Sequence, residues 1–435
     1  MPINHTNFVN WFRDSAPYIH AHRNKTFVIC FSGEAVDEEC DNLIHDFALL
    51  KSLGIRLILV HGIRLQIDQR LKQKKIIPWF NQNLRITDDS ALLCVKEAAG
   101  LVRVEIEAML SMGLANSPMA GAKIKVASGN FVIARPLGII DGVDHQHTGK
   151  VRRIEHAAIH QQLDQDNVVL ISPIGYSPTG EIFNLAAEQV ATEVAIAVQA
   201  EKLILLTEEN CTSQQKLIPQ MTASEAEHFL HKNTNIDITQ TSALNAAIQS
   251  CQQGVKRVHL INRNIEGALL LELFTRDGKG TLISSNPFEE IRPANLEDIA
   301  GILELIKPLE QQGLLVKRSR EKLEIEINDY IVIQRDGLII GCTALHQMND
   351  KQSAEIACLA IHTDYQNSAR GNSLLEHLVS KAKREKLNKL FVLSTQSMHW
   401  FIERGFQVTE IDTLPEQRKE FYNYERNSKV LCKSI

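Results

Sequence analysis

The stretch CLAIHTDYQNSARGNSLL, residues 358–375, decides the fold of the C-terminal part of the chain. An apolar run typical of a strand ends at Ile361, and the polar turn 366–371 follows it. A helix is then predicted to open at Asn372 and Ser373, because apolar residues recur on one helical face after them. The free N–H groups of a first helical turn, together with the helix dipole, form an anion site. We therefore expect this turn to bind an anionic group.

The strands and helices expected on either side of this turn follow a characteristic order along the chain. Apolar strands are predicted at 338–345, 354–361 and 390–395, and 401–406 is a short helix that ends at Gly405. This order resembles the GNAT family of acetyl-CoA-dependent N-acyltransferases, whose pyrophosphate loop reads Gln/Arg-x-x-Gly-x-Gly/Ala. Gln366 and Gly371 match that loop, whereas Ala369 replaces its first glycine. The resemblance implies that acetyl-CoA contacts Cys358, Leu359, Ala360, Ile361, Gln366, Ala369, Arg370, Gly371, Asn372 and Ser373.

Length and composition set limits on the class of protein. A chain of 435 residues exceeds the size of one hydrophobic core, so we expect two or three domains. The net charge of −5 argues against a nucleic-acid binder. The 8 cysteines form no CxxC pair and no metal-ligand spacing, which predicts reduced thiols in the cytoplasm and no metal. No apolar run reaches ~18 residues and no signal pattern opens the chain, so we expect no membrane segment.

The first ~285 residues alternate strands and helices, which predicts an α/β domain with a mainly parallel sheet. Strands are expected at 26–31, 55–60, 131–135, 168–172, 203–207 and 257–261, and a helix at 185–199. This half resembles the amino acid kinase family, in particular its N-acetylglutamate kinase branch, which implies a three-layer domain. The matching segments are 31–33, 60–62, 126–130, 205–207 and 259–281.

The same half departs from that family where phosphoryl transfer takes place. The lysine that neutralises the transferring group is Cys30 here, and the His-Gly-Gly-Gly loop reads His61-Gly62-Ile63-Arg64. The side chains of Ile63 and Arg64 are expected where backbone amides would cradle phosphate. We interpret this domain as a kinase fold without kinase chemistry; the alternative is a diverged but active kinase.

Together the two halves resemble the family of bacterial N-acetylglutamate synthases, most densely at 304–313, 317–321 and 423–431. The boundary is expected near 284–287, followed by an opening strand at 288–293 and a helix at 296–306 capped by Asn295. The predicted divisions are an N-terminal arm (1–20), an amino acid kinase-like domain (21–284) and a GNAT α/β domain (289–435). The resemblance implies transfer of the acetyl group of acetyl-CoA to the α-amine of L-glutamate, the first step of arginine biosynthesis.

That reaction needs a proton acceptor, a proton donor and cations for two carboxylates. Glu355 resembles the family's general base and Ser394 its acid, and the Cys358–Leu359 amides could stabilise the thioester carbonyl. The alternatives are a solvent-facing strand carboxylate for Glu355 and a backbone-bonded hydroxyl for Ser394. The predicted ligands of the glutamate carboxylates are Arg318, Arg426 and Ser428.

Two further features concern regulation and assembly. The resemblance implies an arginine site at His259, Glu272, Gly278, Gly280 and Thr281, although Lys279 replaces an apolar residue; the alternative is a strand–helix packing unit. Phe8, Trp11 and Phe12 form an apolar stripe on one helical face. The family resemblance implies that this stripe belongs to an arm that docks on another subunit of a homo-oligomer, such as a hexamer. The stripe could instead fold on its own domain. Two rival functions stay open, an N-acetylglutamate kinase-type phosphotransferase and an arginine-binding regulator with an inactive GNAT domain.

Overall fold

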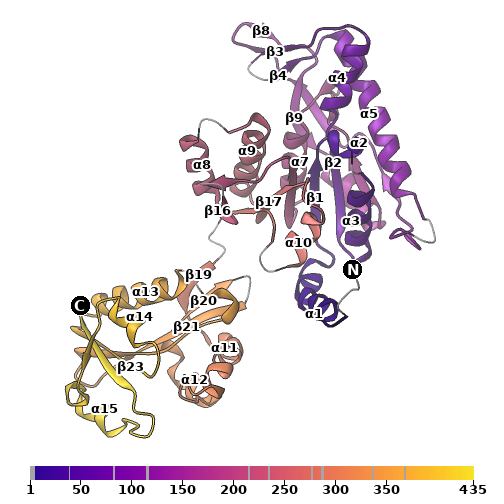
Figure 1. Ribbon diagram of the computed structural model, residues 1–435. Helices are drawn as coiled ribbons and strands as arrows, with labels where there is room; N and C mark the ends of the chain where they lie inside the picture. Colours follow the sequence, from indigo (N-terminus) through magenta and orange to yellow (C-terminus); the bar gives the residue numbers. More distant parts are fainter. Residues whose placement is uncertain are drawn as a thin grey trace. The chain divides into compact units, whose positions relative to one another are not determined.

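The structure, a computed structural model, describes residues 5–38, 40–81, 84–113, 117–213, 216–233, 236–275, 278–285, 289–335, 338–366 and 369–435. It divides into two compact units, Met1–Pro287 and Phe288–Ile435 (Figure 1). Asn286, Pro287 and Phe288, where we expected the boundary and the first residue of the opening strand, lie outside the described residues. So do Asn367 and Ser368 of the polar turn.

The first unit is built on a sheet with the strand order β16-β18-β17-β13-β1-β2-β10-β5. Neighbouring strands run parallel except β17 and β18, which confirms the mainly parallel sheet. The central strands are continuous apolar runs because both faces of the sheet are covered. The bounds are β1 (Thr26–Phe31), β2 (Arg56–His61), β5 (Val126–Ala127), β10 (Val168–Ile171), β13 (Lys202–Thr207), β16 (Gln220–Thr222), β17 (Arg257–Asn262) and β18 (Thr281–Ser284).

Helices cover both faces of this sheet, which gives the predicted three layers (Figure 1). Alternate residues of β1 enter opposite cores: Val28 and Cys30 belong to one, and Phe27, Ile29 and Phe31 belong to the other. The first core is closed by α6 (His156–Asp164), α7 (Ala187–Ala197), α8 (Ala223–Lys232) and α9 (Ile238–Gln252). The second is closed by α2 (Glu34–Glu38), α3 (Cys40–Ser52), α4 (Arg64–Gln73), α5 (Asp89–Leu110) and α10 (Ala268–Phe274).

The first unit also contains smaller sheets beside the main one. The strand expected at 131–135 joins one of them, with the order β12-β11-β6-β9, and not the main sheet. Its strands are β6 (Val132–Pro136), β9 (Gly149–Ile154), β11 (Ile174–Tyr176) and β12 (Ile182–Asn184). The remaining pairs are β3 (Trp79–Asn81) with β4 (Leu84–Ile86), β7 (Ile139–Ile140) with β8 (Val143–Asp144), and β14 (Thr212–Ser213) with β15 (Lys216–Leu217).

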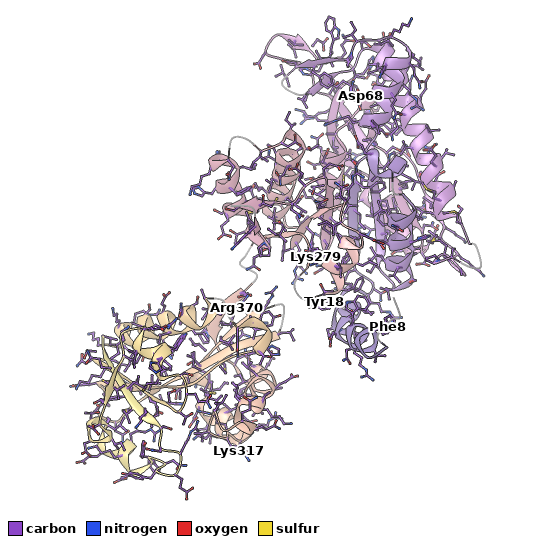
Figure 2. All side chains as sticks on the ribbon, in the orientation of Figure 1. Phe8, Tyr18, Asp68, Lys279, Lys317 and Arg370 are labelled. Carbon is purple, nitrogen blue, oxygen red and sulfur yellow. The ribbon has the colours of Figure 1, made fainter. Side chains whose placement is uncertain are left out.

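The N-terminal helix α1 (His5–His22) is anchored to its own unit at its C-terminal end. Tyr18 packs against the core (Figure 2), and the His22 Nε2 atom lies 2.8 Å from the carbonyl oxygen of Leu273 on α10. The apolar stripe near the N-terminal end of α1 is exposed, with Phe8 54% and Phe12 56% exposed. Thus α1 combines an attached end with an exposed apolar end.

The second unit is a mixed sheet with the order β19-β20-β21-β22-β23-β25-β24, in which only β22 and β23 pair in parallel. Helices lie on both faces, as the predicted GNAT α/β fold requires. The strands are β19 (Glu289–Pro293), β20 (Tyr330–Arg335), β21 (Leu338–Gln347), β22 (Ser353–Ile361), β23 (Lys389–Ser394), β24 (Gln407–Thr409) and β25 (Lys429–Ser434). The helices are α11 (Ile299–Gln311), α12 (Arg320–Glu326), α13 (Arg370–Arg384), α14 (Met398–Ile402) and α15 (Glu416–Glu420), with short 3-10 turns at η1 (Leu296–Asp298), η2 (Ile327–Asp329), η3 (Thr363–Tyr365) and η4 (Ile411–Thr413).

The start of α13 differs from the sequence expectation. The helix begins at Arg370 and not at Asn372, because the Ser373 N–H already bonds the Ala369 carbonyl at 2.9 Å. The Gly-Asn-Ser sequence has low helix propensity, so the apolar pattern placed the start too late. Gly371 therefore lies inside the first helical turn.

Candidate active site

An irregularity in β22 opens the sheet of the second unit. Cys342 pairs with Ala360 and Ala344 with Ala357, so two residues, Cys358 and Leu359, lie opposite Thr343 alone. Cys358 takes a φ of +54°, as the extra residue of a bulge. Pairing of β22 with β23 ends at Ile356 within the described residues, so the two strands part beyond it. Backbone groups of the 357–361 segment are thereby available on that edge, where the sequence placed the thioester.

The first turn of α13 has the features of an anion site. Its N-cap residue, Ala369, offers no side-chain acceptor to the free N–H groups. Gly371 keeps the approach open, since a Cβ there would lie 3.2 Å from the Trp400 ring. Arg404 stacks on that ring at 3.9 Å and donates from Nε to the Asn372 Oδ1 at 2.6 Å. This contact holds α14 against the start of α13.

Other residues that were predicted to contact the cofactor use their side chains for hydrogen bonds within the protein. The Arg370 guanidinium donates to Glu289 on β19 at 2.7 Å and lies over the Tyr365 ring. The Gln366 amide donates to the Ile361 carbonyl at 3.2 Å, and the Ser373 hydroxyl to the Ala369 carbonyl at 3.2 Å. In this arrangement the loop faces a ligand with its backbone more than with these side chains.

Glu355 is held in an ion pair that the sequence did not suggest. Arg418 on α15 donates from Nε to one carboxylate oxygen at 2.5 Å and from Nη2 to the other at 3.0 Å. The hydrogen bond and charge of Glu355, opposed by partial burial, raise the pKa of Arg418. Arg418 sits in the charged run 416–420, which reads as a solvated helix, so no signal in the sequence singled it out.

Arg318 and Arg426, far apart in the sequence, come together in the structure. Burial, followed by the positive charge of Arg318, lowers the pKa of Arg426. Arg426 Nη2 donates to the Leu314 carbonyl at 2.5 Å, while its buried Nε has no partner among the described residues. Arg318 interacts electrostatically with Cys358 at the bulge and with Tyr330. The two positive charges therefore act on one another, and Arg318 also acts on Cys358 at the bulge.

Ser394 and Ser428 occupy strand ends near this region. The Ser394 hydroxyl accepts a hydrogen bond from the Ser397 N–H at 2.9 Å, which leaves its own hydrogen available for donation. Ser428, directly before β25, is 8% exposed, and its carbonyl accepts from the Tyr422 hydroxyl at 2.6 Å. Backbone bonding of Ser394, the alternative considered from the sequence, is therefore compatible with a donor role.

In the first unit, Glu272 is the centre of a buried network. It accepts from the Lys279 and Gly280 N–H groups at 2.7 and 2.8 Å, and it lies 2.7 Å from His259 Nδ1. Burial opposes its ionisation, but the bond and charge of His259 and the two N–H donors outweigh burial and lower the pKa of Glu272 to about 2. A Cβ at Gly278 would lie 2.2 Å from a Glu272 oxygen, so the turn requires glycine.

Gly280, which directly precedes β18, and Thr281, its first residue, extend this network toward the strand. A Cβ at Gly280 would lie 2.5 Å from the Leu260 carbonyl oxygen, so glycine is required there too. The Thr281 hydroxyl donates to the Ile218 carbonyl at 2.7 Å. Glu272 is thus bonded to His259 and to the Gly280 N–H and lies against Gly278, while Thr281 begins β18.

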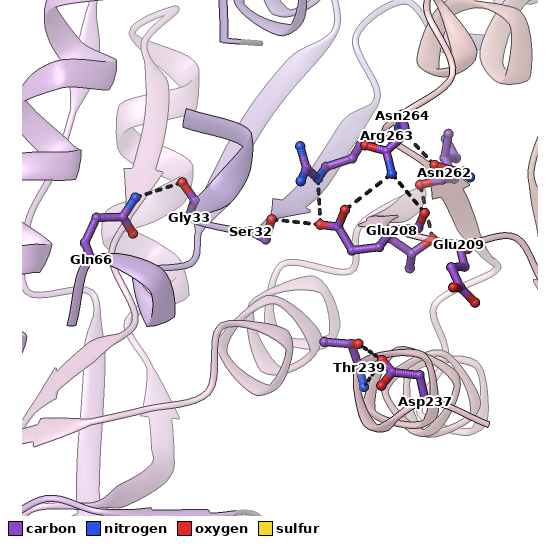
Figure 3. A network of polar contacts seen from close by, with 12 residues as sticks. Ser32, Gly33, Gln66, Glu208, Glu209, Asp237, Thr239, Asn262, Arg263 and Asn264 are labelled. Atoms are coloured by element: carbon purple, nitrogen blue, oxygen red, sulfur yellow. Dashed lines mark hydrogen bonds and ion pairs between the residues drawn. The ribbon is translucent and has the colours of Figure 1, made fainter. Parts of the chain in front are cut away.

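A separate pocket of about 660 Å³ lies in the first unit. Cys30 lines it, and burial together with the charge of Glu188 raises the pKa of that thiol well above its usual value. Ile63 is 3% exposed and packs into the core beside α4, and it also lines the pocket. Glu208 is bonded by Arg263 at 2.6 Å and by Ser32 at 3.4 Å (Figure 3).

The described part of the chain contains neither a helix that could cross a membrane nor a cluster of side chains that could hold a metal ion. No helix there is long and apolar enough to cross a membrane. No group of three or more His, Cys, Asp or Glu residues is arranged to hold a metal ion among these residues.

Comparison with known proteins assigns both units. Residues 25–262 match the amino acid kinase family and residues 299–406 the acetyltransferase (GNAT) family. The amino-acid acetyltransferase of Azotobacter vinelandii is 50% identical over 99% of this chain and 100% of its own length. That of Pseudomonas fluorescens is 48% identical over 98% and 99%.

A solved structure resembles the chain over nearly its full length. The N-acetylglutamate synthase of Neisseria gonorrhoeae, complexed with coenzyme A and L-arginine, has a TM-score of 0.90 and 37% identity, covering 98% of this chain and 99% of that one. The same Neisseria protein complexed with coenzyme A and N-acetyl-glutamate has a TM-score of 0.63 and 38% identity over the same shares.

Proposed function

The chain belongs to the amino-acid acetyltransferase family, and from this premise we propose that it acetylates the α-amine of L-glutamate, giving N-acetyl-L-glutamate and CoA. It is an acetyltransferase with acetyl-CoA as co-substrate. We further propose that the reaction is the first step of arginine biosynthesis, carried out in the cytoplasm by a homo-oligomer. The domain roles follow the predicted division at 21–284 and 289–435.

One observation carries the choice of substrate. Arg318 and Arg426 converge, and Arg318 interacts with Cys358, whose bulge opens the edge of β22. Guanidinium groups bind carboxylates through two parallel hydrogen bonds, and an amino acid with a second carboxylate needs more than one fixed cation. The unpartnered Arg426 Nε supplies a donor for such a ligand. This arrangement suits glutamate better than an amine without carboxylates.

The residues of the second unit suit each step of acetyl transfer. The α-ammonium of glutamate gives a proton to Glu355, directly or through water, and its nitrogen forms a bond to the carbonyl carbon. Backbone N–H groups at the bulge donate to the carbonyl oxygen as it gains negative charge. The carbon–sulfur bond then breaks, and Ser394 protonates the departing thiolate. The new amide nitrogen loses its second proton through water, and that proton restores the Ser394 hydroxyl. Because Arg418 already pairs with Glu355, the incoming ammonium must share or replace that guanidinium.

We propose that the first unit senses arginine through the Glu272 network and has no kinase activity. The complex of the Neisseria relative with L-arginine supports the effector, and the neutral Cys30 thiol in place of a lysine supports the loss of phosphoryl transfer. The proposed arginine ligands are His259, Glu272, Gly278, Gly280 and Thr281.

A release assay for CoA tests the proposal and separates its rivals. We expect CoA release with acetyl-CoA and L-glutamate, slower release with L-aspartate, and a rate that arginine changes. If CoA is released at the same rate without glutamate, glutamate is not the acetyl acceptor. ATP-dependent phosphorylation of N-acetylglutamate by the same preparation would favour the phosphotransferase, and arginine binding without any acetyl transfer would favour the regulator.

A further inference from the structure

Two thiols that take no part in the proposed acetyl transfer meet at the bulge of the second unit. Cys342 on β21 and Cys358 on β22 belong to the same core cluster and are 0% and 5% exposed. Cys342 pairs with Ala360, and the extra residue of the bulge brings Cys358 beside that pair. The Cys342 Sγ atom donates to the Cys358 carbonyl oxygen at 3.6 Å, and the two thiol groups are themselves hydrogen-bonded. The two sulfur atoms are therefore neighbours.

The positions of these cysteines in the sheet suit a cross-link. Strands β21 and β22 are antiparallel, and Cys342 and Cys358 are displaced from direct pairing by one step of the ladder. Opposite residues of antiparallel strands have Cα atoms about 4.5–5.5 Å apart, and a disulfide spans about 4.4–6.8 Å between Cα atoms. Rotation about the side-chain bonds, with a small movement of the bulge, is enough to join the two sulfur atoms.

The two thiols differ in how readily they ionise. The hydrogen bond from Cys342 lowers the pKa of Cys358; burial opposes this effect, and the positive charge of Arg318 adds to it. The same hydrogen bond, together with burial, raises the pKa of Cys342 well above its usual value. A thiolate is the reactive form of cysteine. Cys358 is thus the sulfur that reacts first, and Cys342 is a protonated partner next to it.

From this arrangement we propose that Cys358 and Cys342 form a reversible oxidation site, which a hydroperoxide converts into a disulfide. Hydrogen peroxide is the simplest oxidant of this class, and it is little larger than the water molecules that an open acetyl-CoA site admits. Disulfides that form in reducing compartments are typically transient and redox-sensing. The reduced pair is the active state of the enzyme, and the disulfide is the inactive state.

The oxidation takes place in two balanced steps. The Cys358 thiolate attacks one peroxide oxygen, the O–O bond breaks, and the hydroxide that leaves takes up a proton to become water. The Cys342 sulfur then attacks the sulfur of the resulting sulfenic acid, the S–O bond breaks, and the hydroxyl group leaves as a second water with the Cys342 proton. Peroxide gains the two electrons that the two thiols lose, and a dithiol reductant returns them.

The cross-link would alter the backbone that faces the thioester. A disulfide holds its two Cβ atoms about 3.5–4.5 Å apart, so it draws Cys358 toward β21 and shifts the N–H groups of the bulge. A misplacement of about 1 Å can lower a rate by ~10²-fold. Oxidation also consumes the Cys358 thiol, with which Arg318 interacts. This effect on turnover rests on the proposed function, whereas formation of the disulfide does not.

Peroxide treatment of the full-length protein, followed by peptide mass spectrometry, tests the site. We expect a linked peptide pair that joins Cys342 to Cys358, a loss of CoA release, and recovery of both after dithiothreitol. Saturating acetyl-CoA should slow the loss, because it covers the bulge. Cys342→Ala should keep its turnover before treatment and lose it far more slowly, since it lacks the partner sulfur and the hydrogen bond that favours the Cys358 thiolate. Cys432→Ala removes a more exposed thiol of the same unit and should remain as sensitive as the wild type.

Three results would overturn the proposal. The first is inactivation by peroxide without a linked peptide, and the second is equal sensitivity of Cys342→Ala and the wild type. The third is a linked peptide in protein that retains its full turnover. Circular dichroism checks the fold of each variant, and Cys342→Ser supplies a second variant of nearly the same size. If untreated protein releases no CoA with glutamate, the proposed function fails, and mass spectrometry still decides whether the disulfide forms.

Discussion

At the scale of single residues, the proposed proton acceptor is already paired with a cation. Glu355→Gln keeps a hydrogen-bond acceptor for Arg418 but removes the group that can take up a proton. We expect kcat to fall by ~10²–10⁴-fold, with the KM for acetyl-CoA nearly unchanged. Steady-state kinetics at neutral pH with both substrates varied checks this expectation.

Arg418→Gln is the matched control for that substitution. It leaves the Glu355 carboxylate in place without its counter-charge, so the rate should fall much less than in Glu355→Gln. An unchanged rate in Glu355→Gln would remove Glu355 from the mechanism. Equal losses in both variants would indicate that the pair is needed for structure.

Gly371 permits a different test, because it lies in the first turn of α13 against Trp400. Gly371→Asp adds bulk at a position where a Cβ already lies 3.2 Å from the ring, and it adds a negative charge where an anion should bind. The KM for acetyl-CoA should rise far more than the KM for glutamate. Gly371→Ala, which adds only the Cβ, should have a smaller effect; equal rises in both KM values would point to misfolding.

At the scale of elements, the bulge of β22 depends on one residue with an uncommon backbone conformation. Cys358 has a φ of +54°, which glycine adopts without strain and β-branched residues adopt with difficulty. Cys358→Val should therefore cost roughly 1–3 kcal/mol of stability and lower kcat, whereas Cys358→Gly should retain the bulge and more of the activity. Urea unfolding together with turnover measures both effects. Similar kinetics for Val and Gly would show that the bulge does not shape the site.

The strands and helices of the first unit also hold histidines that must stay neutral. Burial is the main cause that lowers the pKa of His61, at the end of β2, to about 4, and burial followed by the charge of Lys202 lowers the pKa of His22 to about 4. Below pH ~6.5 the unfolded chain takes up protons on both residues, and the folded unit does not until about pH 4. The free energy of unfolding should thus fall between these pH values, by about 1.4 kcal/mol per pH unit for each histidine.

Urea unfolding at several pH values between 7 and about 4 measures this slope. His61→Asn should reduce the slope by the contribution of one proton, about 1.4 kcal/mol per pH unit. His156→Gln, at an exposed position on α6, should leave the slope unchanged. A wild-type stability that is constant over this range would contradict the buried, neutral state of both histidines.

At the scale of the whole molecule, periodicity and motif order predicted both folds, because strand and helix patterns survive over long segments. Sequence reasoning failed where a contact joins distant segments. Examples are Arg418 on Glu355 and Arg370 on Glu289, which pair side chains 63 and 81 residues apart. The start of α13 was misplaced because a single backbone hydrogen bond, and not propensity, sets it. The bulge at Cys358 has no sequence signature either, since a cysteine at positive φ is exceptional.

Glu272 links the proposed arginine site to a test of communication with acetyl transfer. Glu272 is ionised at any pH above about 2, so it offers a full negative charge to a guanidinium group. Glu272→Ala should weaken arginine by roughly ten- to a hundredfold, since a charge-assisted pair contributes about 1.5–3 kcal/mol. Glu272→Gln keeps an acceptor for the Lys279 and Gly280 N–H groups but removes the charge, and it should weaken arginine to a similar extent. Calorimetry with arginine measures both variants, and turnover without arginine shows whether the second unit is intact.

Binding at coupled sites is reciprocal, so the same protein offers a second measurement of this communication. If arginine changes the affinity for glutamate or acetyl-CoA, each of these must change the affinity for arginine by the same factor. Arginine titrations with and without saturating acetyl-CoA should therefore differ in the wild type. In Glu272→Ala the arginine affinity should be low under both conditions, because the substitution removes a direct contact of the effector. If the wild type does not bind arginine at millimolar concentration, the Glu272 network is a packing unit of β17, α10 and β18. Lys279, whose exposed positive charge would repel arginine, is then the first residue to substitute.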